Sequence, residues 1–161
     1  AQLVMGDALA ISLLEQRGFT AADFAKMHPG GALGKRMFLR VEDICLKNEI
    51  PKVDIEEPVK NVIIEISSKR LGATAVLDDN RILGIITDGD IRRMLEKTPD
   101  FINLTAKDIL SKNPQTIGKD ELVVNALSLM RENNITQLLV EHNGDYVGVI
   151  HLHDIINEGI F

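Results

Sequence analysis

The sequence has one cysteine, one tyrosine and no tryptophan among its 161 residues. A single cysteine excludes a disulfide within the chain and a cysteine-based metal site, so we interpret Cys45 as a small, partly buried hydrophobic residue. Long apolar runs are also missing, because residues 3–14 are interrupted by Asp7 and are too few to cross a bilayer. No basic segment precedes this stretch, which excludes a secretory signal. We therefore expect a cytoplasmic protein.

Basic residues are fewer than acidic ones, 18 against 24. The net charge is −6 and the isoelectric point is about 5.2. An acidic surface argues against nucleic acid or an anionic membrane as the main partner. The rest of the composition is that of an ordinary soluble globular protein, with 45% hydrophobic and 26% charged residues. The length fits one compact domain together with a fragment of another.

Internal duplication is the clearest positive signal. Residues 84–91 align with residues 148–155 at an offset of 148 − 84 = 64, and the same offset pairs Val59 with Val123. Identity between the two units is low, but hydrophobic character is kept at nearly every paired position. A unit of about 60 residues buries only about 60% of its unfolded surface, so two units packed face to face are favoured. They would enclose a cleft between their hairpins.

Each unit predicts the element order β-α-β-β-α, which is an α/β (α+β) fold. Asn143-Gly144 marks the second hairpin turn, because both residues tolerate positive φ, and Asp120 is expected to cap the helix before it. We predict three segments: a helical tail and linker at residues 1–40, a first unit at 41–100 and a second unit at 101–161. The expected hairpins pair residues 73–77 with 82–86 and 137–141 with 146–150, and the expected final helices cover 89–96 and 152–157.

Both units end a strand in a Gly-x-x-(Thr/His)-x-x-Asp motif and pass straight into a helix. In one interpretation the motif is structural, because Thr-x-x-Asp forms a capping box at a helix start. In the other it binds a ligand, because free N–H groups at a helix start attract a phosphate, the acid accepts the hydroxyls of a ribose, and the glycine lets a ligand approach the backbone. The candidate effector-binding residues are Thr87, Asp90 and Gly84 in the first unit and His151, Asp154 and Gly148 in the second.

The double unit resembles the CBS domain pair, or Bateman module, from about residue 41 to residue 159. The resemblance implies that a nucleotide such as AMP or ATP binds between the units, that the pairs dimerise, and that the ligand controls an attached enzyme. It also implies that Thr87 and Asp90 contact the phosphate and the ribose of one ligand, and that Asp154 is the second ribose contact. His151 departs from the usual Ser or Thr. It can still hydrogen-bond a phosphate, and would attract one when protonated, so the two sites are not expected to be equal.

The sequence predicts neither a histidine metal site nor a P-loop. His151 and His153 lie on one side of an extended strand with His142 nearby, but three placed ligands and their supporting partners are not evident, so no metal site is expected. A P-loop fails in the first forty residues, because Pro29 occupies the position of the required glycine and Arg36 that of the Ser or Thr that would bind magnesium.

The first forty residues lie outside the repeat. Their motifs at residues 6–10, 17–20 and 28–34 resemble the end of a SIS-type sugar-phosphate isomerase domain. With a CBS pair directly behind them, the combination is similar to the D-arabinose 5-phosphate isomerases. That resemblance implies aldose–ketose isomerisation between D-ribulose 5-phosphate and D-arabinose 5-phosphate through an enediol. The product would feed Kdo synthesis for lipopolysaccharide or capsule.

His28 matches the histidine that this family uses in its active site, and an imidazole suits proton transfer or sugar-ring opening near neutral pH. Taken without the family, His28 is more simply a loop histidine ordered by Pro29. The remaining active-site residues would lie upstream, on a sheet outside this chain. The chain opens without Met inside an expected helix, so we interpret it as part of a longer protein and expect it to be inactive alone.

The leading hypothesis is therefore regulatory binding of a phosphorylated or nucleotidyl effector, with no cofactor required. The candidate effectors are AMP, ATP and the nucleotide sugar CMP-Kdo. CMP-Kdo is included because a product of the same pathway would give feedback control. The resemblance also implies a homo-oligomer, with a dimer mediated by the CBS pair and a tetramer for the parent enzyme. Two alternatives stay open: the pair only dimerises the enzyme and binds no effector, or this chain itself catalyses isomerisation.

Overall fold

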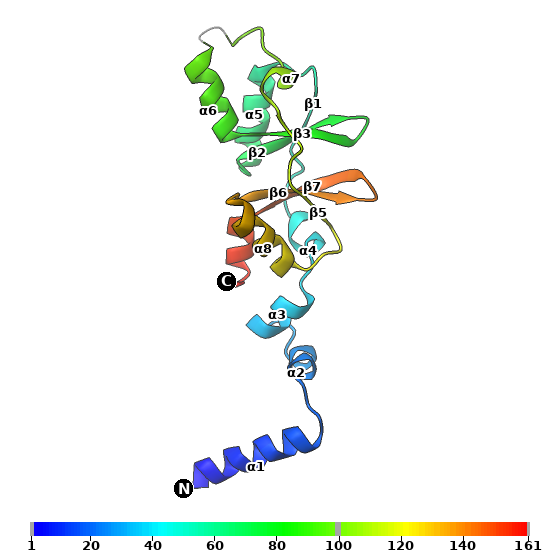
Figure 1. Cartoon of the computed structure of the whole chain (residues 1–161), viewed down its shortest axis with the longest axis vertical. Coiled ribbons are helices and arrows are strands. Elements are labelled where there is room, and N and C mark those ends of the chain that lie inside the picture. The colour runs from blue at the N-terminus through cyan, green and yellow to red at the C-terminus, as the bar shows by residue number, and fades with distance from the viewer. Residues whose placement is uncertain (1, 99–100, 161) are drawn as a thin grey trace.

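A computed structural model describes residues 2–98 and 101–160 of the chain. Two α/β units are stacked on each other, and three helices extend from one end of the stack (Figure 1). These helices are α1 (Gln2–Gln16), α2 (Ala21–Met27) and α3 (Ala32–Phe38). Gly18 follows the first of them with a φ of +61°, the left-handed conformation that suits glycine behind a helix. No residue of α1 is buried, so the tail adds little to the core.

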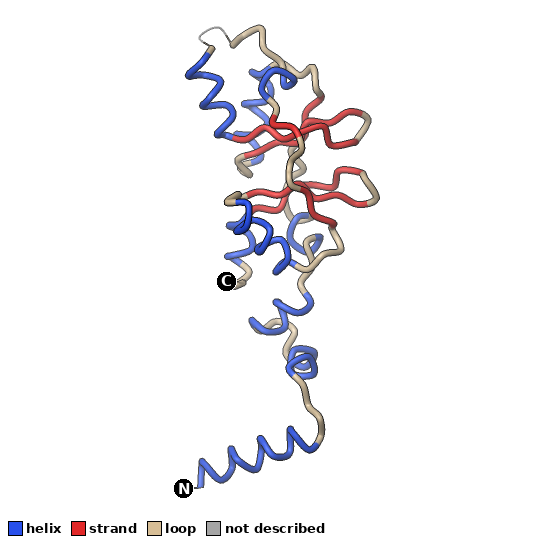
Figure 2. Tube along the Cα trace, viewed as in Figure 1, coloured by secondary structure: helices blue, strands red, loops and turns tan. Residues whose placement is uncertain are grey.

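The element order predicted for each unit is confirmed. Repeat 1 contains β1 (Lys52–Asp54), α5 (Val59–Lys69), β2 (Ala73–Asp78), β3 (Arg81–Thr87) and α6 (Asp88–Lys97). Repeat 2 contains β5 (Thr116–Gly118), α8 (Val123–Asn133), β6 (Gln137–His142), β7 (Asp145–His151) and α9 (Leu152–Asn157). The two sheets face each other, and helices cover their outer sides (Figure 2).

The strand pairing repeats together with the sequence. In both repeats a short strand lies parallel to the first hairpin strand, which pairs antiparallel with the second. The hairpin register shifts between Val76 and Leu77 in repeat 1 and between Val140 and Glu141 in repeat 2, positions that differ by the same 64 residues. Residues 73–77 of β2 are all buried, because one face of the strand packs on helices and the other on repeat 2.

The interface between the repeats is a hydrophobic cluster from both hairpins. Tyr146 is buried there, and its hydroxyl donates to the carbonyl oxygen of Pro51 at 2.7 Å. The backbone N–H of Tyr146 also donates to the carbonyl oxygen of Asn80 at 3.1 Å. Buried apolar surface and satisfied polar groups together make the two repeats one unit. The buried members of this cluster are Leu71, Ala75, Leu77, Leu139, Tyr146 and Val149.

Two short helices are exchanged between the repeats. Helix α4 (Glu42–Cys45) precedes repeat 1 in the sequence, yet Ile44 and Cys45 lie in the core of repeat 2. Helix α7 (Ala106–Ile109) precedes repeat 2, yet Ala106 lies in the core of repeat 1. The Ala106 N–H donates to the carbonyl oxygen of Glu57 at 2.8 Å. Cys45 is thus a buried hydrophobic residue, as expected, and each repeat needs the segment in front of the other to complete its core.

Of the two local predictions made for repeat 2, the hairpin turn is confirmed and the helix cap is wrong. Asn143 and Gly144 both have positive φ, 55° and 87°, which confirms the predicted hairpin turn. The prediction that Asp120 caps α8 is wrong, because the helix starts later and Leu122 is its N-cap residue. The Asp120 carbonyl instead accepts a hydrogen bond from Arg40 in the linker behind α3.

The pseudo-equivalent glycines Gly84 and Gly148 differ in their surroundings. A Cβ on Gly84 would overlap the Leu110 side chain and lie 2.7 Å from the Ser111 carbonyl oxygen. A Cβ on Gly148 would meet only the Cys45 carbonyl oxygen, at 3.9 Å. We expect Gly84→Ala to lower the free energy of unfolding by about 1–3 kcal/mol through overpacking. Gly148→Ala, the matched control, should change it by less than about 0.5 kcal/mol. Urea unfolding measures both, and equal effects would contradict this account.

Candidate functional site

The motif of repeat 1 forms the start of α6. The Thr87 N–H donates to the Asp90 carboxylate at 2.8 Å, and the Thr87 hydroxyl donates to the same oxygen at 2.6 Å. In return the Asp90 N–H donates to the Thr87 hydroxyl oxygen at 3.4 Å. These contacts are the capping box of the structural interpretation. The Thr87 hydroxyl already donates its hydrogen to Asp90. It could donate to a phosphate only by giving up that hydrogen bond.

Asp90 is a buried carboxylate whose oxygens already have several partners. Its side chain is 9% exposed, and it also accepts hydrogen bonds from Arg93 at 2.5 Å and from Ser111 at 3.1 Å. Burial works to raise the pKa of Asp90, but the hydrogen bonds from Thr87, Arg93 and Ser111 outweigh it and hold the pKa below its ordinary value. A ribose hydroxyl could reach this carboxylate only by displacing one of them.

The Thr-x-x-Asp pattern is not by itself a mark of a ligand site. The described part of the chain has two further capping boxes of the same composition, Thr20 with Asp23 before α2 and Thr105 with Asp108 before α7. Both lie outside the repeated motif and are exposed. Burial and the added contacts from Arg93 and Ser111 distinguish Asp90 from them.

The motif of repeat 2 is built differently. The His153 N–H donates to Nδ1 of His151 at 3.0 Å, so the imidazole caps α9. Asp154 takes no part in that cap and instead accepts a hydrogen bond from the Asn48 side chain at 2.9 Å. Burial lowers the pKa of His151, although the neighbouring Asp154 opposes this. At neutral pH the ring is therefore uncharged, and because Nδ1 is an acceptor, Nε2 carries the hydrogen and can donate to a ligand.

The room expected for a ligand at Gly84 is taken by the protein itself. The strand β4 (Ser111–Lys112) pairs with β3 and brings Leu110 and Ser111 against this glycine. The ligand approach at Gly84 stays a prediction, and in this structure the glycine lets β4 pack closely on β3. At Gly148 the neighbouring backbone of α4 is more distant.

A pocket of about 530 Å³ lies at the junction of the two repeats. Repeat 1 contributes Arg70, Gly72 and Asp88, and repeat 2 contributes Gln137 and His151. Of the predicted site residues only His151 lines it. Asp90 lines a separate hollow of about 300 Å³ between α6 and α7, and Asp154 faces the segment behind α4. The structure thus divides the predicted residues among three places.

Arg70 was missed by the reasoning from sequence, although the repeat holds a signal for it. It ends α5 in the left-handed conformation with φ 57°, and its counterpart 64 residues later is Asn134 with φ 52°. Asparagine is a common residue at this position, whereas a long side chain there carries a conformational cost of about 1 kcal/mol or more. Among the described residues Arg70 enters no ion pair. An arginine that lines a pocket and has no carboxylate partner among the described residues can bind an anion there.

The predicted catalytic residue lies in the tail. His28 follows α2, is exposed, and its ring lies 4.9 Å from that of Phe24. Gly34 of α3 packs tightly on it, since a Cβ on Gly34 would lie 2.5 Å from the His28 carbonyl oxygen. Its role in proton transfer stays a prediction.

Residues 2–98 and 101–160 contain no cluster of three or more His, Cys, Asp or Glu side chains placed to hold a metal ion. They also contain no helix with the length and apolar character needed to cross a membrane.

Comparison with known proteins identifies the repeats. The family model described as "CBS domain" matches residues 41–97 and 106–160. The chain belongs to the CBS domain family. Among solved structures, the CBS-domain containing protein ATU1752 from Agrobacterium tumefaciens has a TM-score of 0.67 at 19% identity, covering 75% of this chain and 99% of its own. The CBS domain protein PAE2072 from Pyrobaculum aerophilum, solved in complex with AMP, has a TM-score of 0.65 at 22% identity and covers 73% and 90%. Both establish the CBS fold.

A curated relative matches the tail as well as the CBS pair. The arabinose 5-phosphate isomerase KdsD of Yersinia pestis is 44% identical over 162 residues, which cover 99% of this chain and 49% of the relative. The chain therefore spans about half the length of the curated relatives it matches. The similarity includes the first forty residues that the CBS family model leaves out.

Asp90 provides a test of the buried capping box, with Asp108 as its exposed control. We expect Asp90→Ala to lower the free energy of unfolding by about 2 kcal/mol at pH 7, and Asp108→Ala by about 1 kcal/mol. Because folding lowers the pKa of Asp90, its ionised form stabilises the protein above the unfolded pKa of 3.8, and this contribution is lost as the pH falls through the folded-state value. Urea unfolding from pH 7 to pH 3 should show the difference between wild type and Asp90→Ala shrinking. A difference that stays constant over this range would contradict the assignment.

Proposed function

We propose that the CBS pair binds a phosphate-bearing ligand of nucleotide type and thereby regulates a D-arabinose 5-phosphate isomerase. The observation that carries this proposal is the pocket at the junction of the repeats, which both Arg70 and His151 line. Its volume of about 530 Å³ lies within the range of about 300–1,000 Å³ typical of small-molecule sites. A ligand held there touches both repeats at once, so its binding can report on their relative arrangement.

The polar groups of the pocket suit a phosphorylated sugar. The guanidinium of Arg70 can form two parallel hydrogen bonds to a phosphate, and Nε2 of His151 and the amide of Gln137 can add donors. Asp88, on the repeat 1 side, can accept the hydroxyls of a ribose. We assign the phosphate to the Arg70 side of the pocket.

The motif residues other than His151 lie outside this pocket, so they are proposed as contacts of a ligand at the motifs themselves. Thr87 lies next to Asp88, and Gly148 leaves more space than Gly84. Asp90 and Asp154 are the proposed ribose contacts, and they would exchange Ser111 and Asn48, respectively, for ligand hydroxyls. Because the ligand would displace a serine hydroxyl at Asp90 and an asparagine amide at Asp154, we expect it to bind the two motifs with unequal affinity.

AMP is the first ligand to examine, since PAE2072, which shares the CBS fold, was solved with it. ATP and CMP-Kdo are the other candidates, the latter because a nucleotide sugar from the same pathway would give feedback control. None of them serves as a cofactor in the reaction.

The proposed parent enzyme catalyses aldose–ketose isomerisation between D-ribulose 5-phosphate and D-arabinose 5-phosphate, in Kdo formation for lipopolysaccharide or capsule. Support comes from the 44% identity to KdsD across the tail and both repeats. His28 would act there in proton transfer or ring opening, in the cytoplasm, within a homo-oligomer of dimers or tetramers. The tail at residues 1–40 would close the SIS domain, ahead of CBS units at 41–100 and 101–161.

A second candidate function is assembly without an effector. An apolar hollow of about 450 Å³ lies between α8 and α9, lined in part by Leu127, Met130 and Ile156. Ile156 is 41% exposed, and such a surface suits a helix of a second copy. In this reading the pair only dimerises the enzyme.

Calorimetry with AMP separates the two functions. We expect AMP to bind wild type and Arg70→Ala to weaken binding by about tenfold or more, because a charge-assisted hydrogen bond to phosphate is lost. Arg92→Ala, an exposed arginine on α6 outside the pocket, should change the affinity by less than about twofold. If AMP or ATP binds and CMP-Kdo does not, CMP-Kdo is dropped as effector. If none binds, and Ile156→Asp abolishes a dimer seen by ultracentrifugation, the assembly function is the better one.

A further inference from the structure

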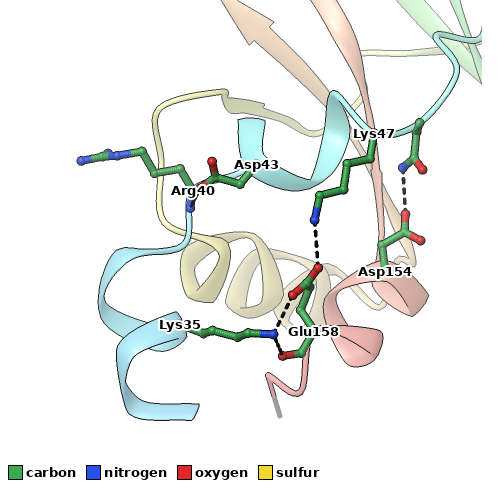
Figure 3. Close-up of polar contacts among 7 residues, drawn as sticks. Lys35, Arg40, Asp43, Lys47, Asp154 and Glu158 are labelled. Atoms are coloured by element: carbon green, nitrogen blue, oxygen red, sulfur yellow. Dashed lines mark hydrogen bonds and ion pairs between the residues drawn. The ribbon is translucent and has the colours of Figure 1, made fainter. Parts of the chain in front are cut away.

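Glu158, directly behind α9, joins three segments of the chain (Figure 3). Its carboxylate accepts hydrogen bonds from Lys35 of α3 at 2.7 Å and from Lys47 at 3.0 Å, and its carbonyl oxygen accepts a second bond from Lys35 at 2.9 Å. The hydrogen bonds from Lys35 and Lys47 hold the pKa of Glu158 below its ordinary value. The side chains of Lys35 and Glu158 are only 29% and 26% exposed, so this pair is better shielded than an ordinary surface ion pair.

Lys35 is the polar link between the tail and the repeats. In the part of the chain that the structure describes, Lys35 makes every side-chain hydrogen bond and ion pair that joins α1–α3 to the rest of the protein. Its neighbour Gly34 is buried against the backbone of His28 and Pro29. Packing this close means that α3 and His28 move together.

Asp154 lies one helical turn before Glu158 and is tied to the same stretch of chain. Asn48 donates to Asp154 at 2.9 Å, while the preceding residue, Lys47, donates to Glu158 (Figure 3). Residues 47 and 48 therefore bridge two successive turns at the end of α9. Loss of the Asn48–Asp154 hydrogen bond removes a restraint on the Lys47–Glu158 hydrogen bond, because Lys47 and Asn48 are neighbours on one backbone.

We propose that the end of α9 is a relay: release of Asn48 from Asp154 weakens the contact of Glu158 with Lys35 and frees α3, with His28, from the CBS pair. The part that names a ligand rests on the proposed function, since a ligand hydroxyl on Asp154 is what displaces Asn48. The relay gives the regulated enzyme a path from its effector to the histidine loop.

The physical reason is side-chain entropy. Two lysines hold the Glu158 carboxylate in one orientation, so the cost of ordering it is shared between two bonds. When the Asn48 side chain leaves Asp154, residues 47 and 48 keep their backbone hydrogen bonds to Ile44 and Cys45 but lose this tie to α9. Lys47 then holds Glu158 less firmly, and the Lys35 bond carries more of the cost of ordering the carboxylate. That bond is then weaker, and α3 opens more often.

Hydrogen exchange of the α3 amides in the 161-residue chain tests the relay without any ligand. We expect Asn48→Ala to raise exchange in α3 by about threefold and Glu158→Gln by about fivefold. Asn48→Ala should add nothing in the Glu158→Gln background, because the relay is already broken. Lys35→Met breaks the same contact from the other end and should match Glu158→Gln.

The control is Glu49→Gln, which removes the ion pair of Glu49 with Lys69 in repeat 1 and should leave α3 exchange unchanged. Equal urea midpoints for the variants show that global unfolding is not the cause. The relay is overturned if Asn48→Ala leaves α3 exchange unchanged, or if its full effect persists in the Glu158→Gln background.

Saturating AMP adds the ligand step. We expect AMP to reproduce the effect of Asn48→Ala in wild type, and Asp154→Ala to abolish the response to AMP. AMP that binds by calorimetry and leaves α3 exchange unaltered overturns the ligand-driven relay. If AMP does not bind at all, the proposed function fails for this ligand, and the ligand-free comparison of Asn48→Ala with Glu158→Gln still decides whether the relay exists.

Discussion

The exchange of α4 and α7 between the repeats is the constraint on which the rest of the structure depends. Ile44 and Cys45 complete the core of repeat 2, and Ala106 completes that of repeat 1. Neither repeat can close its core alone, because a unit of about 60 residues buries too little surface and each lacks a piece held by the other. The junction pocket follows from this arrangement, and so does the stretch behind α4 that reaches α9.

The two repeated motifs share a sequence pattern but not a structure. Thr87 and Asp90 form a buried capping box that Arg93 and Ser111 reinforce. His151 caps α9 through its ring and leaves Asp154 to Asn48. One motif therefore starts α6 with a buried capping box, while the other places an imidazole at the pocket and a carboxylate against the segment behind α4.

Much of the fold could be predicted from the sequence, because periodic hydrophobic residues and turn residues recur at an offset of 64. The exchange of α4 and α7 could not be predicted. Helices of four residues carry no periodic pattern, and the sequence does not show which repeat they pack against. The same limit explains the site. Gly84 is required because Leu110 and Ser111 pack against it, and Ser111 also occupies the carboxylate of Asp90. These partners lie more than twenty residues away in the sequence.

The central claim is that the junction of the repeats, with Arg70 and His151, holds a phosphorylated ligand. Nuclear magnetic resonance of the isotope-labelled chain during an AMP titration tests it most directly, because Arg70, Gln137 and His151 each carry a side-chain N–H that reports on hydrogen bonding. The account predicts that these three signals shift together and saturate at one AMP concentration. Signals that stay unshifted, or shifts confined to Arg93 and the hollow beside α6, would contradict it.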